Sequence, residues 1–339
     1  METIFEIDPT RRTPKYQQII NSVTKSIKSG KLKKGDKILS INELSNECLL
    51  SRDTVQKAYT LLEEDGIITA IPGKGFYINR TDITIPYRIL LLFNKISNYK
   101  KQIYNSFVEV MGNKAAVDLK IFHCDSIIFE NYINTYLNEY DYYVIMPHFY
   151  ENIETAYKAI LKIPEDKLLI LDKNMPGLQT NVGAVYQDFQ NDIAEALEGG
   201  MHLLQKYNKL ILVYPETIPY PYEIVTGFKN FCMEYHFAYS ITHECHTGTV
   251  PHAKEAWIVI EETDLVNLIK KCMSGNLKIG KDIGIISYNE TPLKEILLDG
   301  ITVISTDHAK MGETAARLIL ENSKQKIKNP FSLIQRKSL

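Results

Sequence analysis

The 339-residue sequence lacks the features that mark several classes of protein. None of its apolar runs is longer than Ile89–Phe93, whereas a membrane-spanning helix needs about 20 apolar residues. No basic leader followed by an apolar stretch opens the sequence, so we expect no signal peptide. The five cysteines form no C-x-x-C pair, which favours a reducing compartment over a disulfide framework. We therefore expect a cytoplasmic protein that does not enter a membrane.

Motifs of common enzymes are also missing. The sequence has no G-x-x-x-x-G-K-[ST] phosphate-binding loop, and no G-x-S-x-G elbow surrounds Ser287 or precedes Asp307. The histidines and cysteine between His243 and His252 do not have the spacing of a closed zinc site. We therefore expect no catalytic residues, no metal and no cofactor.

What is present is an ordinary globular composition with an uneven charge. Apolar residues make up 45% and charged residues 24% of the sequence, and the length suggests two domains, with three as the alternative. Residues 1–80 carry 13 basic against 10 acidic side chains, whereas residues 81–339 carry 26 against 31. A mildly basic head on an acidic body is a weak indication that the head has a polyanionic partner.

The first 80 residues contain strong signals for short helices and a hairpin. Ser40 and Glu43 have the spacing of a capping box, and Ser51 can cap Thr54. The turn Pro72-Gly73-Lys74-Gly75 separates two β-prone segments. The expected elements are a helix at 14–29, a short helix from Ser40 to about Glu47, a helix from Ser51 to Asp65, and strands at 67–71 and 76–78.

The helix that begins at Ser51 is amphipathic in a way that suits a DNA reader. Val55, Ala58, Tyr59 and Leu62 share one side of the helix, and polar residues share the other. Base edges in a major groove are read by polar side chains from the N-terminal half of such a helix. The alternative, a small helical domain with solvated charges, is left open by this spacing alone.

Residues 14–78 resemble the winged helix-turn-helix head of the GntR family of bacterial regulators. The match lies in residues 35–44 (Gly-Asp-Lys-Ile-Leu-Ser-Ile-Asn-Glu-Leu), 50–59 (Leu-Ser-Arg-Asp-Thr-Val-Gln-Lys-Ala-Tyr), 61–68 and 72–77. Asn42 stands where the family usually has arginine, so one contact is weakened or changed. The resemblance and the polar helix face together give the candidate DNA-binding residues Ser40, Asn42, Ser51, Arg52, Asp53, Thr54, Gln56, Lys57, Gly73, Lys74 and Gly75.

From residue 87 onward, apolar β-runs alternate with amphipathic helical stretches. Near-continuous apolar strands bounded by helices predict parallel sheets covered on both faces, and about 250 residues suffice for two α/β lobes. We expect a linker at 81–86 and the two-lobe domain at 87–339. The expected strands are at 88–93, 117–123, 142–146, 168–171, 210–213, 257–260, 283–286 and 302–304, with helices at 193–207, 223–235 and 308–322.

The body resembles the effector domains of lactose-repressor-type regulators, relatives of periplasmic sugar-binding proteins. The resemblance is carried by residues 282–292 (Asp-Ile-Gly-Ile-Ile-Ser-Tyr-Asn-Glu-Thr-Pro), 301–307, 311–316 and the final strand near 333–338. It implies an α/β fold class: a small α+β winged-helix domain at 1–80 followed by a periplasmic-binding-protein-like domain of two parallel α/β lobes.

Ligands of open parallel sheets bind beyond the carboxyl ends of the strands. Two departures from the family, Ile224 in place of arginine and Glu261-Glu262 in place of Asn-Asp, change the ligand chemistry. The missing arginine argues against a carboxylate- or phosphate-bearing effector. Aromatic rings, here those of Tyr222 and Tyr288, can stack on the apolar face of a sugar. The candidate effector-binding residues are Asn94, His148, Asp172, Tyr222, Glu262, Tyr288 and Asn289.

The sequence thus predicts a DNA-binding transcription regulator whose binding to double-stranded operator DNA is controlled by a small-molecule effector, expected to be a monosaccharide. Regulators of this kind read palindromic DNA with two heads related by two-fold symmetry, so we expect a homodimer. Two alternatives remain: a fused enzyme-like protein and a sugar-binding protein with an accessory winged-helix head. The first would need a cofactor lysine motif and a larger body, and the second is disfavoured by the DNA-binding head.

Overall fold

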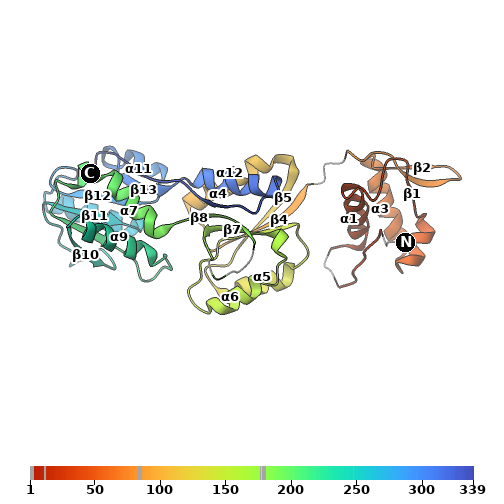
Figure 1. The fold of residues 1–339 in the computed structure, drawn as a ribbon, viewed down its shortest axis with the longest axis horizontal. Coiled ribbons are helices and arrows are strands. Elements are labelled where there is room, and N and C mark those ends of the chain that lie inside the picture. The colour runs from red at the N-terminus through yellow and green to blue at the C-terminus, as the bar shows by residue number, and fades with distance from the viewer. Residues whose placement is uncertain (1–3, 11–12, 83–85, 176, 178–180, 247) are drawn as a thin grey trace. The chain divides into compact units, whose positions relative to one another are not determined.

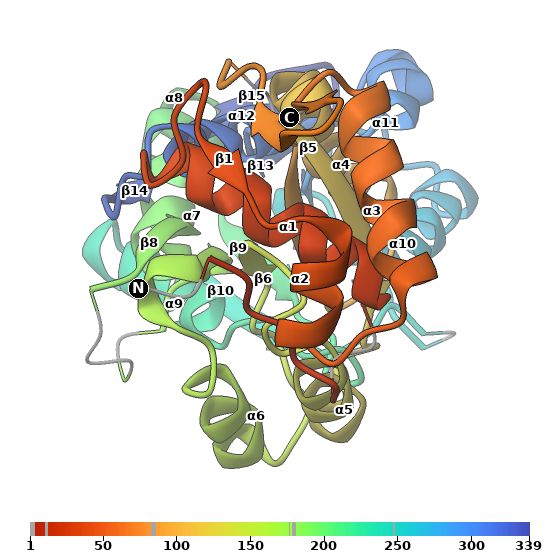
Figure 2. The same cartoon turned by 90° about the vertical axis from the view of Figure 1, so that its right-hand side faces the viewer.

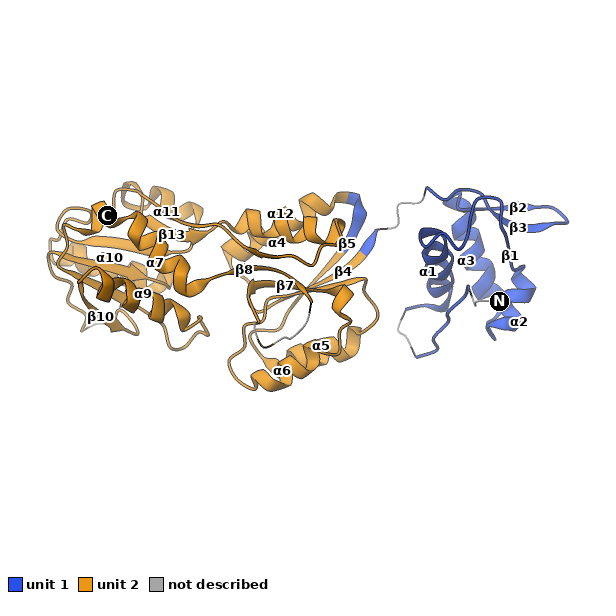
Figure 3. Ribbon diagram, viewed as in Figure 1, with its two compact units in different colours: residues 1–87, 113–116 blue, residues 88–112, 117–339 orange. Residues whose placement is uncertain are grey.

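The fold is taken from a computed structural model that describes residues 4–10, 13–82, 86–175, 177, 181–246 and 248–339. The chain divides into two compact units, one of residues 1–87 with 113–116 and one of residues 88–112 with 117–339 (Figure 3). Within the expected linker 81–86, residues 83–85 lie outside the described residues.

The first unit is built from three helices and a small sheet (Figure 2). Strand β3 lies in the middle of the sheet and pairs antiparallel with both β1 and β2. The elements are α1 (Lys15–Lys28), β1 (Lys37–Ile38), α2 (Ile41–Glu47), α3 (Arg52–Glu64), β2 (Ile68–Ile71) and β3 (Gly75–Ile78).

Local sequence explains where the helices of this unit begin. The Ser40 hydroxyl accepts from the Glu43 amide and the Glu43 carboxylate accepts from the Ser40 amide, so the predicted capping box is confirmed. Ser51 caps α3 by accepting from the Thr54 amide at 3.3 Å. The predicted buried face of α3 is also confirmed, because Val55, Ala58, Tyr59 and Leu62 are all buried.

The first lobe of the second unit contains a six-stranded sheet in the order β14-β8-β7-β6-β4-β5. The pairings of β4 with β6, β6 with β7, β7 with β8 and β8 with β14 are parallel. Its elements are β4 (Tyr87–Phe93), α4 (Asn98–Met111), β5 (Ala115–Ile121), α5 (Ser126–Tyr136), β6 (Tyr142–Ile145), α6 (Ile153–Ile160), β7 (Leu168–Lys173), β8 (Gly183–Gln187), α12 (His308–Leu320), β14 (Lys326–Lys328) and short 3-10 turns at Gly112–Lys114 and Glu165–Lys167.

The second lobe contains a six-stranded sheet in the order β10-β9-β11-β12-β13-β15, in which only the β13–β15 pairing is antiparallel. Its elements are α7 (Phe189–Gly199), α8 (Met201–Leu204), β9 (Lys209–Val213), α9 (Glu223–Glu234), β10 (Ala238–Thr242), β11 (Glu255–Val259), α10 (Glu262–Ser274), β12 (Gly284–Tyr288), α11 (Pro292–Ile296), a 3-10 turn at Leu297–Asp299, β13 (Thr302–Thr306) and β15 (Phe331–Ile334).

Three chain crossings join the lobes, from β8 to α7, from β13 to α12 and from β14 to β15 (Figure 1). Buried Asn329 ties them together: its amide nitrogen Nδ2 donates to Thr306 Oγ1 at 2.7 Å, and its main-chain nitrogen donates to the Tyr186 carbonyl at 2.8 Å. The main-chain nitrogen of Asp307 also donates to the Pro330 carbonyl at 2.9 Å. The crossings therefore form one hydrogen-bonded hinge.

The predicted fold class is confirmed, with local differences. Every expected strand is present, but β1, β8, β10 and β14 were not anticipated. The single helix expected at 193–207 is two helices, α7 and α8, separated at Gly200. Within the described ranges, no helix combines the length and apolar character that crossing a bilayer requires.

Candidate functional site

The polar face of α3 is exposed at its N-terminal end. Ser51, Arg52, Asp53 and Gln56 are exposed, and Thr54 is half-buried beneath the Ser51 hydroxyl, 2.8 Å from it. The opposite face is held in the core, where the Tyr59 hydroxyl donates to the Leu39 carbonyl at 2.7 Å. This bond connects α3 to the residue before the cap of α2, so the two helices are fixed relative to each other.

The remaining DNA-binding candidates lie on α2, on α3 and at the hairpin tip. Asn42 is exposed on the first turn of α2, and Lys57 of α3 lies over the Tyr16 ring with its ammonium 4.1 Å from the ring centre. The tip residue Lys74 is exposed, and both glycines beside it have positive φ, 75° at Gly73 and 107° at Gly75. Side chains are strained at such φ values, so the glycines allow this tight turn.

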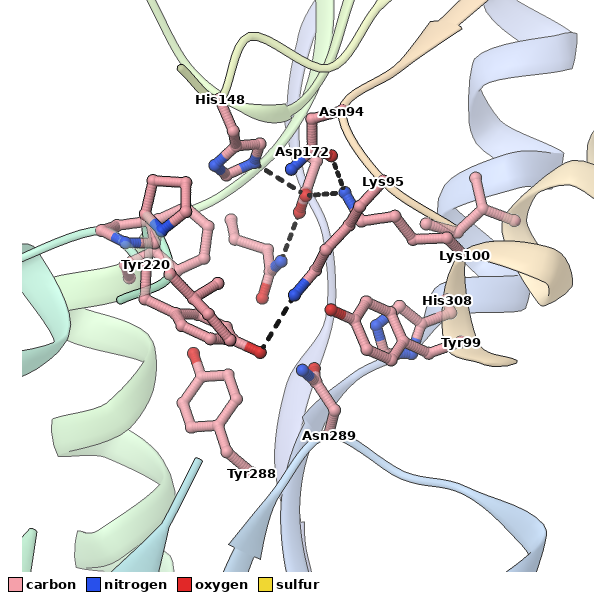
Figure 4. Close-up of a pocket in the computed structure, with 16 residues that line it drawn as sticks. Asn94, Lys95, Tyr99, Lys100, His148, Asp172, Tyr220, Tyr288, Asn289 and His308 are labelled. Atoms are coloured by element: carbon pink, nitrogen blue, oxygen red, sulfur yellow. Dashed lines mark hydrogen bonds and ion pairs between the residues drawn. The ribbon is translucent and has the colours of Figure 1, made fainter. Parts of the chain in front are cut away.

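A cavity lies between the two lobes of the body (Figure 4). Of the seven sequence-predicted effector residues, the five that line it are Asn94, His148, Asp172, Tyr288 and Asn289. Asn94, His148 and Asp172 come from the first lobe and Tyr288 and Asn289 from the second, because the carboxyl ends of both parallel sheets face the gap.

Asp172 is the centre of a buried polar network at this cavity. Its carboxylate is 3.5 Å from Lys100 Nζ, and it accepts from His148 Nε2 at 2.9 Å and from Gln187 Nε2 at 2.5 Å. Lys100 is itself 3% exposed and also donates to Asn94 Oδ1. Burial alone would raise the pKa of Asp172, but Lys100 and the donated hydrogen bonds outweigh it and hold that pKa well below its usual range. Asp172 is therefore ionised and already fully paired by the protein.

The two histidines of the cavity are neutral near pH 7. Burial lowers the pKa of His148, and it lowers the pKa of His308 to about 4. A neutral His148 that donates through Nε2 to ionised Asp172 carries its proton on that nitrogen. His308 packs its ring against Tyr99, with ring centres 4.9 Å apart. The cavity therefore gains no positive charge from its histidines.

A hydrogen-bonded chain crosses from one lobe to the other at the edge of the cavity. Lys95, which follows β4 in the first lobe, donates to the Tyr220 hydroxyl of the second lobe at 3.4 Å (Figure 4). The Tyr220 hydroxyl in turn donates to Glu261 Oε1 at 2.7 Å. Because burial and the nearby charge of Glu261 raise the pKa of Tyr220 well above its usual value, the phenol stays protonated.

A second, outer cavity adjoins the first, and the two share Lys95, Tyr99, Tyr220, Tyr288 and Asn289. Glu262, predicted from sequence, lines this outer cavity rather than the inner one. Tyr222 lines neither described cavity: its side chain is 61% exposed and it packs edge-on against Tyr214. The expected stacking role of Tyr222 is corrected, because the turn into α9 directs Tyr222 outward and places Tyr220 in the cavity.

Comparison with known proteins identifies the head. Residues 15–78 match the family model "Bacterial regulatory proteins, gntR family". The transcriptional repressor YtrA of Bacillus subtilis is 33% identical over 120 residues, which are 35% of this chain and 87% of YtrA. The chain belongs to the GntR family.

The body of this GntR-family protein has the fold of a periplasmic-binding-protein-like domain, whose family model matches residues 202–339. The Lac repressor bound to ONPG has a TM-score of 0.61 at 16% identity, over 85% of this chain and 90% of that chain. A LacI-family regulator of Enterococcus faecium with bound ribose has a TM-score of 0.58 at 18% identity, over 74% and 98%. The protein is thus a DNA-binding transcription regulator with a periplasmic-binding-protein-like body.

Lys100, Gln187, Tyr220 and His308 are among the residues of the GntR-family protein's inner cavity that sequence reasoning missed. Gln187 ends β8, a strand that was not anticipated, and His308 follows the Asp307 cap of α12. The strand-end rule that selected Asp172 would have selected Gln187 had β8 been recognised. Lys100 carried no such signal, because a lysine next to Lys101 in a helix usually faces water.

Proposed function

We propose that this GntR-family regulator reads operator DNA with α3 and the hairpin tip, and that an uncharged sugar in the inter-lobe cavity changes its operator binding. The observation that carries the proposal is the inner cavity itself, which is lined by polar groups from both lobes. Its buried charges, Asp172 and Lys100, are paired with each other, and its histidines are neutral. Such a lining suits a neutral polyhydroxy ligand.

The proposed effector would act by favouring one arrangement of the lobes. A ligand shifts an open–closed equilibrium only by its different affinity for the two states, and a ligand that contacts both lobes has that difference. We take residues 1–80 as the DNA-binding domain, 81–86 as the linker and 87–339 as the effector domain. Because the linker leads directly into β4, a lobe rotation would change the separation of two heads in a dimer.

The same proposal makes the protein a cytoplasmic regulator and not an enzyme. Its similarity to transcription regulators supports this class, and the Lac repressor and the ribose-bound regulator share the fold of its body. A pyridoxal-dependent body, as in fused aminotransferase-like regulators, would give the purified protein an absorbance band above about 320 nm. A spectrum with such a band would contradict the regulator-only proposal.

A thermal-shift screen of neutral mono- and disaccharides against the full-length protein tests the effector proposal. A sugar at about 100 times its Kd stabilises its binding domain by about 2.7 kcal/mol, which is readily measured. The active sugar is then titrated by calorimetry with and without a DNA duplex selected from a random library by the protein. Linkage requires sugar and duplex to change each other's affinity by the same factor. A factor of one, with a sugar that binds, would contradict control of DNA binding by the sugar.

We also propose that the protein is a homodimer of about twice 38.9 kDa. One head reads few base pairs, and a two-fold dimer doubles the contacts on a palindrome. In the body, α11 exposes the apolar side chains of Leu293 and Ile296, which are 64% and 76% exposed and available to a second copy. Light scattering at micromolar concentration measures the mass, and a monomer both with and without the selected duplex would contradict the proposal.

Arg52→Ala is expected to weaken binding of the selected duplex by about 1–3 kcal/mol and to relax its sequence preference. Arg52 is exposed at the first turn of α3, where a side chain reaches base edges. Lys74→Ala, at the hairpin tip, should instead weaken all duplexes alike and reduce the salt slope by about one. Anisotropy titrations at several salt concentrations measure both effects.

The matched control for both variants is Lys158→Ala, which removes an exposed positive charge from α6 in the body. It should leave affinity and salt slope unchanged. If Arg52→Ala binds the selected duplex as tightly as the wild type, the N-terminal turn of α3 does not read base edges.

A further inference from the structure

Two buried polar atoms that face the inner cavity find no hydrogen-bond partner among the described residues. They are Gln187 Oε1 and the Tyr288 hydroxyl, in side chains that are 7% and 2% exposed. An unpaired buried polar group destabilises a protein, and such groups are rare in native structures. Both atoms lie at strand ends that point into the cavity, one in each lobe.

The orientation of the Gln187 amide is fixed by the protein. Its Nε2 donates to Asp172 Oδ1 at 2.5 Å, so the other end of the amide, the Oε1 acceptor, is the one left unpaired. Asp172 is ionised and accepts only. A ligand that pairs with Gln187 Oε1 must therefore place a hydrogen-bond donor beside it.

The Tyr288 ring cannot serve as the stacking surface that the sequence suggested. It is buried in the core of the second lobe and packs against Phe331, with ring centres 5.7 Å apart. Burial, together with the charges of Asp192 and Asp172, raises the pKa of Tyr288 well above its usual value. Its hydroxyl is therefore neutral and can donate to a ligand oxygen.

We infer that Gln187 and Tyr288 are the residues that determine effector specificity, by hydrogen bonding the ligand from opposite lobes through Gln187 Oε1 and the Tyr288 hydroxyl. Asp172, whose carboxylate is occupied by Lys100, His148 and Gln187, is a positioning residue that acts through the Gln187 amide. The inference rests on the proposed sugar effector and narrows it. The ligand is an uncharged polyhydroxy compound with a hydroxyl donor at Gln187 and an acceptor oxygen at Tyr288.

Tyr288→Phe tests the inference through two effects of opposite sign. It removes only an unpaired buried hydroxyl, so the unliganded protein should melt higher, by roughly 2 °C. The same variant should bind the sugar found in the wild-type screen about tenfold more weakly. A purely structural role for the hydroxyl would lower the melting temperature or leave sugar affinity unchanged.

Tyr207→Phe is the matched control. The Tyr207 hydroxyl is also buried without a partner in the described part of the chain, but it belongs to the core of the second lobe and lines neither cavity. This variant should raise the melting temperature similarly and leave sugar affinity unchanged. An equal loss of sugar affinity in both variants would overturn the assignment of Tyr288.

Monodeoxy analogues of the active sugar give the decisive measurement. The analogue that lacks the oxygen read by Tyr288 should bind wild type and Tyr288→Phe equally, whereas the parent sugar distinguishes them. Gln187→Met should behave in the same way toward a different analogue, one that lacks the hydroxyl donor. If each variant loses the same factor of affinity for the parent sugar and for every analogue, the inference is overturned.

Asp172→Asn tests the positioning role. An asparagine amide can donate to Gln187 Oε1, which would turn the Gln187 amide and present its donor end to the ligand. The expected result is a changed order of preference among the analogues at the Gln187 position, and an unchanged order would overturn the positioning role.

If no sugar shifts the wild-type melting temperature, the proposal of a sugar effector is wrong, and the inference that rests on it is wrong too. A wild-type response that Tyr288→Phe and Gln187→Met retain in full overturns the inference alone.

Discussion

Asp172→Ala is expected to destabilise the effector domain by about 3–5 kcal/mol and to abolish the sugar response. The substitution leaves the Lys100 ammonium, 3% exposed, without the carboxylate that now lies 3.5 Å away. It also removes the acceptor that orients His148 and Gln187. Urea unfolding of the full-length protein measures the loss of stability. Binding to the selected duplex, tested at a temperature where the variant remains folded, should survive because no head residue is changed.

A double variant separates the buried charge from the packing. Lys100→Met combined with Asp172→Ala removes both charges, and it should recover a large part of the stability lost in the single variant. Glu130→Ala is the control for an exposed pair: Glu130 lies 3.3 Å from Lys162, with side chains 32% and 40% exposed, and its loss should cost less than about 1 kcal/mol. If Asp172→Ala alone is as stable as the wild type, the ion pair between Lys100 and Asp172 does not stabilise the protein.

The same residues show how far the sequence predicts the site. Asn94, His148, Asp172 and Asn289 each follow a predicted strand, and all four line one cavity. The rule works because parallel strands place their carboxyl ends at one edge of a sheet. The rule identifies positions, but it does not show which of their side chains are already paired with other protein groups. The pairing of Asp172 with Lys100 depends on the direction of α4 against the sheet, which no local pattern encodes.

The errors of the prediction have similar causes. The strands β10 and β14 lie at sheet edges and have few buried side chains, so they carry little of the apolar signal that reveals central strands. Tyr220 and Tyr222 are two residues apart, and only the precise start of α9 decides which of them enters the cavity. The head was predicted more accurately because capping serines and turn glycines act through their immediate neighbours.

Gly312→Ala is expected to destabilise the effector domain by about 3 kcal/mol or more, since it forces apart two helices that cross in close contact. Gly312 lies on α12 against α4, and a Cβ there would overlap the Ile103 carbonyl oxygen and the Ser106 hydroxyl and lie 3.0 Å from the Phe107 nitrogen. Two of these three atoms are backbone, so rotamer changes cannot relieve the overlap. Urea unfolding measures the effect.

The control is Gly199→Ala at the end of α7, where an added Cβ meets nothing within 4 Å. That variant should be as stable as wild type or slightly more stable, because alanine favours helix over glycine. The consequence for function follows from the position of α4, whose first turns carry Tyr99, Lys100 and Ile103 of the inner cavity. Displacing α4 moves Lys100 away from Asp172, so Gly312→Ala should also weaken sugar binding. A variant that loses stability but keeps full sugar affinity would show that the lysine–aspartate pair tolerates this movement of the helix.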